Sequence, residues 1–173
     1  LPVSYVTHWH TQPLLLDAFS KKVKSRILAY PEILRKEVHL VFTAHSLPET
    51  ILAEGDPYPT HLQQTMDGIV SRLGALLPKE KIQFAYQSKG MSGGLWLGPD
   101  MEEVLKGFAE NSTVLMAPIG FLADHVEILY DIDIYYKEIA KARGINLNRI
   151  ESQNTAPLFI HALAAVVHAN LPL

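Results

Sequence analysis

Apolar residues along the chain follow a helical period in some segments and form short continuous runs in others. In residues 11–30, Leu15, Phe19, Val23 and Ile27 recur every four positions, which predicts a helix with one buried face. Further helices are predicted for residues 65–77, 100–110, 121–136 and 157–170. The apolar and β-branched runs predict buried strands for residues 37–44, 81–88, 112–120 and 145–151. The last of these is expected at an edge of the sheet.

This alternation of strands and helices predicts an α/β fold. We expect a three-layer α/β/α sandwich around a mainly parallel four-stranded sheet, similar to a Rossmann-like or flavodoxin-like unit. Sheets of this kind bind ligands beyond the carboxyl ends of their strands. Three segments directly follow predicted strands and should therefore lie close together in space: residues 45–59, 87–100 and 120–127.

Each of these segments carries residues that suit binding or catalysis. His45 comes where an apolar run ends, and its imidazole can act as a base, ligate a metal, or only hydrogen-bond at the strand end. The glycine-rich residues 87–100 contain Trp96, which can cover a flat apolar ligand or anchor a tight turn. Gly55, Pro57 and Pro59 predict a rigid turn.

The segment 121–136 has an unusual distribution of acidic residues. At 100° per residue, Asp124, Glu127, Asp131 and Tyr135 share one helical face without a Lys or Arg among them. Like charges one turn apart weaken a helix by a few tenths of a kcal/mol per pair, so a cation is expected there unless the face is simply solvated. The opposite face is apolar and should anchor the helix through Val126, Leu129 and Ile132.

Histidine with carboxylates suits divalent iron, cobalt, nickel or zinc, and the same groups can move protons. The spacing does not choose between these roles. The other histidines carry less weight: His8 and His10 flank Trp9 in a segment expected to be irregular, and His161 and His168 are expected on the surface of the last helix.

Composition excludes several classes of function. The 173 residues carry a formal net charge of −3, and Lys and Arg are scattered, so no nucleic-acid partner is expected. Cysteine is absent, which excludes disulfides, cysteine-ligated zinc and an iron–sulfur cluster. No apolar run approaches the roughly 20 residues that span a bilayer.

Several motifs resemble those of the ferrochelatases, which insert ferrous iron into a porphyrin to make haem. The similar segments are AHSLPE, GDPYP, QSK with WLGP, PIGF with ADHVEILYDID, and ESQNTAPLF, in the family's order and spacing. The resemblance covers only the C-terminal half of the family's two-part fold. It implies that residues 1–173 form one α/β domain, with an inter-domain connector over about 1–12 and the chelatase half over 13–173.

The resemblance also implies roles for individual residues. His45 and Glu127 correspond to the family's catalytic pair. His45, Glu127 and Asp131 correspond to its metal-binding residues. The family's helix widens locally to π geometry, and Tyr135 stands where many relatives have a further acidic residue. Porphyrin-binding or supporting roles are implied for Ser46, Pro48, Trp96, Asp124, His125 and Tyr130.

The implied partners are Fe²⁺ and a porphyrin, with no further cofactor, together with the family's N-terminal half. That half would supply any peripheral contact with a membrane. We expect a cytoplasmic bacterial enzyme, with an organellar one as the alternative, and weak turnover and self-association for this chain alone. Two other functions remain open: a chelatase for another metal or tetrapyrrole, such as a cobalt chelatase, and a non-catalytic flavodoxin-like binding module.

Overall fold

The computed structural model describes residues 3–90 and 93–171, and its centre is a sheet of four parallel strands. The strand order is β2-β1-β3-β4, so the last strand lies at an edge as predicted. In the register of the sheet, His45 is opposite Gln87 and Thr43 is opposite Pro118, which places the ends of three strands along one edge. The strands are β1 (His39–His45), β2 (Ile82–Gln87), β3 (Thr113–Pro118) and β4 (Asn146–Arg149).

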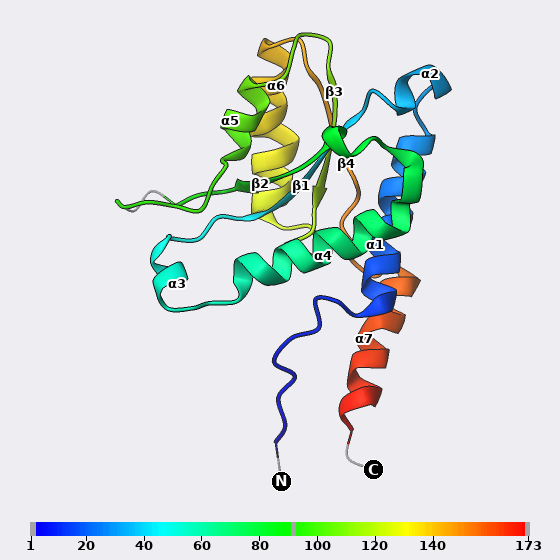
Figure 1. Ribbon diagram of the computed structural model, residues 1–173, viewed down its shortest axis with the longest axis vertical. Helices are drawn as coiled ribbons and strands as arrows, with labels where there is room; N and C mark the ends of the chain where they lie inside the picture. Colours follow the sequence, from blue (N-terminus) through cyan, green and yellow to red (C-terminus); the bar gives the residue numbers. More distant parts are fainter. Residues whose placement is uncertain (1–2, 91–92, 172–173) are drawn as a thin grey trace.

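Helices cover both faces of the sheet and bury two separate cores, so the predicted three-layer α/β fold is confirmed (Figure 1). One face packs against α1 (Pro13–Leu28), α4 (Tyr58–Leu73) and α7 (Pro157–Asn170). The other packs against α5 (Met101–Lys106), η3 (Glu127–Tyr136) and α6 (Lys137–Ala142). Short connecting helices are α2 (Glu32–Arg35), α3 (Thr50–Ala53), η1 (Gly74–Leu76) and η2 (Lys79–Lys81).

The helix predicted over 121–136 begins later in the structure, and it has the π geometry that the resemblance implies. Residues 121–125 are irregular, and Glu127–Tyr136 is a π-helix, whose hydrogen bonds span five residues and whose turn is wider than that of an α-helix. Ile128, Ile132 and Tyr136, four residues apart, are therefore the buried positions.

The predicted apolar anchor is consequently wrong at two of its three positions. Val126 is 74 % exposed and Leu129 is 49 % exposed, whereas Ile132 is fully buried. Asp124 lies before the helix begins, so it does not share a helical face with Glu127 and Asp131.

The residues predicted as a rigid turn are divided between a turn and a helix: Gly55, with a φ of 73°, lies in the turn, whereas Pro59 lies in α4. Asp56 accepts a hydrogen bond from the Tyr58 backbone N–H at 2.8 Å, and Pro59 occupies the first turn of the helix, where a missing N–H has no cost. The helix therefore starts at Tyr58 rather than at residue 65, and its first turn lies beside the end of β1.

The segment before α1 and the C-terminal part of α7 extend beyond the sheet toward the same end of the molecule (Figure 1). Near their base, the rings of Trp9 and Phe159 stack with centroids 6.4 Å apart. Residues 1–2 and 172–173 of the predicted domain, and residues 91–92 of the glycine-rich segment, lie outside the described residues. Among the helices that are described, none has the length and apolar character needed to cross a membrane.

Candidate functional site

The ends of β1 and β3 bring His45 and Glu127 together. β1 ends at His45, the segment after β3 leads into η3, and Glu127 is the first residue of that π-helix. The His45 Nε2 atom lies 3.3 Å from Glu127 Oε1, and both side chains are partly exposed. An imidazole nitrogen and a carboxylate oxygen thus face the same accessible space.

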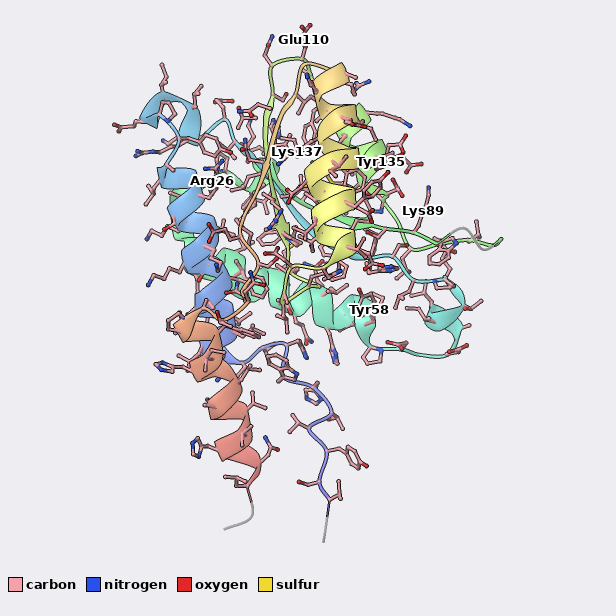
Figure 2. All side chains as sticks on the ribbon, turned by 180° about the vertical axis from the view of Figure 1, so that it is seen from behind. Arg26, Tyr58, Lys89, Glu110, Tyr135 and Lys137 are labelled. Atoms are coloured by element: carbon pink, nitrogen blue, oxygen red, sulfur yellow. The ribbon has the colours of Figure 1, made fainter. Side chains whose placement is uncertain are left out.

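The environment of His45 determines which ring nitrogen is free. Its Nδ1 lies within hydrogen-bond distance of the Ser46 carbonyl, which can only accept, so Nδ1 carries the proton of the neutral ring. The Nε2 lone pair is then directed to the side where Glu127 lies. Tyr58, at the start of α4 (Figure 2), supports the same strand end, because its hydroxyl donates to the His45 carbonyl at 2.9 Å. Burial raises the pKa of Tyr58 to about 12, so this donor stays protonated at neutral pH.

His125 approaches the second carboxylate oxygen of Glu127, and Phe121 approaches both histidine rings. The His125 Nδ1 atom is 3.8 Å from Glu127 Oε2, and the His125 ring lies 4.6 Å from the ring of Phe121. Phe121 also approaches His45, edge to face at 6.3 Å. The pair of His45 and Glu127 is therefore flanked by one further imidazole and one aromatic ring.

Asp131 is positioned by a residue from the end of β2. Ser88 has a positive φ of 58°, and its hydroxyl donates a short hydrogen bond to Asp131 Oδ2. The backbone N–H of Ser88 donates to the Tyr136 hydroxyl at 3.4 Å. One turn farther along η3, the Tyr135 hydroxyl donates to Glu102 Oε2 at 2.8 Å.

These contacts assemble a pair and not a three-ligand cluster. In the described part of the chain, no group of three or more histidine and acidic side chains has the geometry to hold a metal ion. The structure thus joins His45 with Glu127, and holds Asp131 separately through Ser88. A metal at this pair would take its remaining ligands from water or from a bound substrate.

The segments after β1 and β2 pair with each other beside this site. The buried hydroxyl of Ser46 donates to the Leu97 carbonyl at 2.8 Å, and Pro48 forms an antiparallel bridge with Trp96. A Cβ atom on Gly90 would come within 2.7 Å of the Trp96 ring, so the glycine permits this close approach. Three strand-end segments therefore meet, as the sequence predicts.

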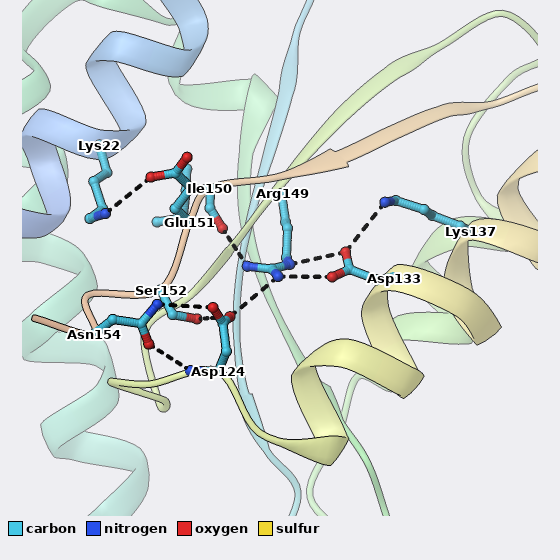
Figure 3. A network of polar contacts seen from close by, with 9 residues as sticks. All are labelled: Lys22, Asp124, Asp133, Lys137, Arg149, Ile150, Glu151, Ser152 and Asn154. Carbon is cyan, nitrogen blue, oxygen red and sulfur yellow. Dashed lines mark hydrogen bonds and ion pairs between the residues drawn. The ribbon is translucent and has the colours of Figure 1, made fainter.

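Asp124 belongs to a polar network that fixes the segment before η3 (Figure 3). Its carboxylate accepts hydrogen bonds from Ser152 at 2.7 Å and from Asn154 at 2.9 Å, and it pairs with Arg149 at 3.3 Å. Arg149 also donates to both carboxylate oxygens of Asp133, at 3.0 and 2.8 Å. The network ties the end of β4 to the helix that carries Glu127.

The same network controls the charge of its two carboxylates. Hydrogen bonds from Asn154 and Ser152, with the nearby charge of Arg149, lower the pKa of Asp124. Burial alone would raise the pKa of Asp133, but hydrogen bonds and charge from Arg149 and Lys137 outweigh it and lower that pKa. Both residues are ionised at neutral pH and serve as anchors for Arg149.

The structure brings some of the predicted residues to the pair of His45 and Glu127 and leaves others apart from it. Tyr130 is 54 % exposed on η3 and makes none of the contacts that hold His45 or Glu127. Three supporting residues were not predicted: Ser88, Tyr58 and Arg149. Ser88 belongs to the QSK motif directly after a strand, which is a usable signal. Nothing local in the sequence connects Arg149 with Asp124.

Comparison with known proteins indicates the family of the chain. The ferrochelatase family model matches residues 1–171. The chain is 41 % identical over 166 residues to a ferrochelatase of Deinococcus radiodurans, covering 95 % of this chain and 52 % of that protein. It is 38 % identical over 165 residues to a coproporphyrin III ferrochelatase of Geobacillus kaustophilus, covering 94 % of this chain and 51 % of that protein.

A mitochondrial ferrochelatase of Bos taurus is 37 % identical over 172 residues, covering 97 % of this chain and 40 % of that protein. The chain spans about half the length of the first two relatives. The family model covers nearly all of its residues. The chain belongs to the ferrochelatase family.

Proposed function

We propose that this chain is the metal-side half of a ferrochelatase, which inserts Fe²⁺ into a porphyrin. The observation that carries the proposal is the contact between His45 Nε2 and Glu127 Oε1 at 3.3 Å, at the carboxyl edge of a parallel sheet. Membership of the family supports the reaction, and the pairing of an imidazole with a carboxylate supports these two residues as its catalytic groups.

His45 would accept the protons that the porphyrin loses. Each Fe²⁺ that enters the ring replaces two pyrrole N–H protons, so the site needs a base that works near neutral pH. With Nδ1 donating to the Ser46 carbonyl, the Nε2 lone pair is available for one proton at a time. Glu127, 3.3 Å away, would stabilise the imidazolium and take the proton onward, which frees His45 for the second transfer.

Glu127 and Asp131 would bind the substrate metal as it loses water. A carboxylate at each position stabilises a dication, and the first turn of η3 separates the two. Asp131 accepts a hydrogen bond from Ser88, which holds one of its oxygens and leaves the other for a hydrated ion. Fe²⁺ would pass from Asp131 toward His45 and Glu127, and Tyr135 would form the outer end of this path in place of a carboxylate.

The porphyrin would lie against the segments after β1 and β2. Ser46, Pro48 and Trp96 hold these two segments together, and the Trp96 ring offers an apolar surface to a flat macrocycle. Asp124 and His125 would fix the wall next to Glu127. The Tyr130 side chain is exposed on η3 and would contact the porphyrin once the porphyrin is bound.

The partner of this half would be the N-terminal half of the same kind of protein. Relatives about twice as long as the match support this proposal. That half would complete the porphyrin cleft and make any contact with a membrane surface, and the whole enzyme would work in the bacterial cytoplasm. Alone, the chain should insert iron weakly at best, because half of the macrocycle's contacts are missing.

A chimaeric enzyme tests the proposal. The matching half of the Deinococcus radiodurans relative is replaced by this chain, and Fe²⁺ insertion is followed without oxygen by the loss of porphyrin fluorescence. We expect an active chimaera and a loss of about 100-fold or more with His45→Ala. His161→Ala, at an exposed position of α7, is the matched control and should keep the activity. Near-normal insertion by the His45→Ala chimaera would remove His45 from the mechanism.

A cobalt chelatase is the second candidate, because an imidazole with carboxylates also binds Co²⁺. Running the same assay with both metals separates the two functions. The non-catalytic binding module is less well supported, because it gives no reason for three strand-end segments to converge on the same imidazole and carboxylate.

A further inference from the structure

A crevice of about 600 Å³ lies between α1, the segment after β4 and the start of α7. Neither His45 nor Glu127 lines it, so it is separate from the proposed catalytic site. Its volume falls in the range of about 300–1,000 Å³ that small-molecule sites occupy. The crevice is large enough for a ligand of metabolite size.

Basic side chains outnumber acidic ones around this crevice, by four to one. Lys21, Lys22 and Arg26 come from one face of α1, and Arg149 comes from the end of β4. Glu151 is the one acidic residue among those that line it. Glu151 is 92 % exposed and its contact with Lys22 is 3.6 Å long, so it neutralises the lysine weakly (Figure 3).

Gln153 supplies a second and independent indication of a ligand. The residue lines the crevice and is 1 % exposed. Neither its Nε2 nor its Oε1 has a hydrogen-bond partner in the part of the chain that the structure describes. A buried amide without partners destabilises the fold, so a ligand that accepted from Nε2 would recover part of that cost.

The start of α7 adds a third favourable feature. Ala156, Pro157 and Leu158 line the crevice, and no side chain caps this end of the 14-residue helix. The free backbone N–H groups and the helix dipole make such an end favourable for an anion. The lysines, the amide and the helix end therefore all favour negative charge at the same place.

We propose that this crevice binds a small phosphate-bearing anion. A guanidinium fork binds carboxylate and phosphate alike, and donors of both guanidiniums here are already used. Arg26 Nη2 donates to Asn148 at 2.8 Å, and Arg149 is bound to Asp133. Ammonium groups and backbone N–H groups remain, and these suit the tetrahedral oxygens of phosphate.

Titration of the 173-residue chain with pyrophosphate, by calorimetry and by amide NMR, tests the proposal. We expect saturable one-to-one binding, with shifts at the N–H groups of Leu158 and Phe159. The double variant Lys21→Gln/Lys22→Gln should bind about tenfold more weakly or worse, since two charge-assisted contacts are lost. The matched control Lys24→Gln/Lys141→Gln makes the same charge change at exposed positions outside the crevice and should bind as wild type.

A vesicle-binding experiment identifies the source of the phosphate. Sedimentation with phosphatidylglycerol vesicles, reversed by pyrophosphate, would assign a lipid headgroup, and its absence would assign a soluble phosphate compound. The proposal is overturned if wild type shows no saturable binding, or if both double variants bind equally well. Tighter binding of citrate than of pyrophosphate would overturn the assignment to phosphate.

Discussion

The His45 Nε2 atom lies 3.3 Å from Oε1 of Glu127, although the two residues belong to segments that follow different strands. The Ser46 carbonyl holds the opposite nitrogen of the ring, so the lone pair of His45 and the carboxylate of Glu127 share one space. The segments around them are held by the Ser46 hydroxyl, the glycine beside Trp96 and the side chain of Arg149. Each of these supports can be removed separately.

Replacing Ser46 with Ala should weaken the fold next to His45. The Ser46 hydroxyl is buried and donates to the Leu97 carbonyl at 2.8 Å, so its removal leaves that carbonyl without this donor. We expect the free energy of unfolding to fall by about 1–2 kcal/mol. Urea denaturation measures this. Ser71→Ala on the exposed side of α4 is the control and should change it by less than about 0.5 kcal/mol.

Replacing Gly90 with Ala should displace the Trp96 ring. The added Cβ would lie 2.7 Å from the ring, too close for any side chain to tolerate without movement. In a Trp9→Phe background, where Trp96 is the one remaining tryptophan, we expect a shifted emission maximum and stronger quenching by acrylamide. Gly93→Ala meets no atom within 4 Å and should leave the fluorescence unchanged. Equal spectra for both variants would contradict the packing of Trp96 over Gly90.

Replacing Arg149 with Gln should reduce stability in a pH-dependent way. Arg149 lowers the pKa of Asp133 and contributes to the lowered pKa of Asp124. Carboxylates with a depressed folded-state pKa stabilise the fold above the unfolded pKa of about 4, and this stabilisation is lost as the pH falls through the folded pKa. At pH 7 the free energy of unfolding of the variant should therefore be about 2 kcal/mol lower than that of wild type, and this difference should shrink below pH 4.

Denaturation curves at pH 7 and at pH 3 check the sign of this effect. Arg143→Gln is the control, because Arg143 donates to the Lys106 carbonyl at 2.7 Å and forms no ion pair among the described residues. Its effect on stability should be the same at both pH values. If Arg149→Gln lowers the free energy of unfolding equally at pH 7 and at pH 3, its stabilising effect does not come from its carboxylate partners.

The chain should self-associate through the end where α7 and the N-terminal segment project. Several apolar side chains there are exposed, including Val3 at 72 %, Tyr5 at 85 % and Val167 at 57 %. Exposed apolar groups gathered at one end favour association with another surface. We expect light scattering to give a mass above that of the monomer, and Tyr5→Glu/Val167→Glu to restore the monomer. Ile33→Glu, at an 85 % exposed position on α2, is the control and should stay associated; a monomeric wild type at high concentration would contradict the prediction.

The sequence predicts the layers of the fold and the meeting of three strand ends because these follow from apolar periodicity and from parallel topology. His45 and Glu127 are found in this way, since His45 is the last residue of β1 and Glu127 follows the segment after β3. Helix boundaries were harder to predict. Pro57 and Pro59 are predicted as part of a turn, but Pro59 lies in the first turn of α4, where the Tyr58 backbone N–H donates to Asp56.

The winding of η3 and the position of Asp124 could not be obtained from a regular helical wheel. A π-helix changes which residues face the core, so Leu129 becomes exposed while Ile128 is buried. Asp124 is drawn away from the helix by Arg149, Ser152 and Asn154, which come from a distant part of the chain. Long-range hydrogen bonds of this kind have no local signal in the sequence.

A titration with Co²⁺, used as a spectroscopic substitute for Fe²⁺, tests the central claim most directly. Wild type, His45→Ala, Glu127→Gln and the double variant are compared, with His161→Ala as the control. The pairing of His45 with Glu127 predicts saturable binding in wild type and the control, weaker binding in each single variant, and none in the double variant. Binding that is unaffected by both changes, or no binding by wild type, would contradict the claim that this pair forms the metal site.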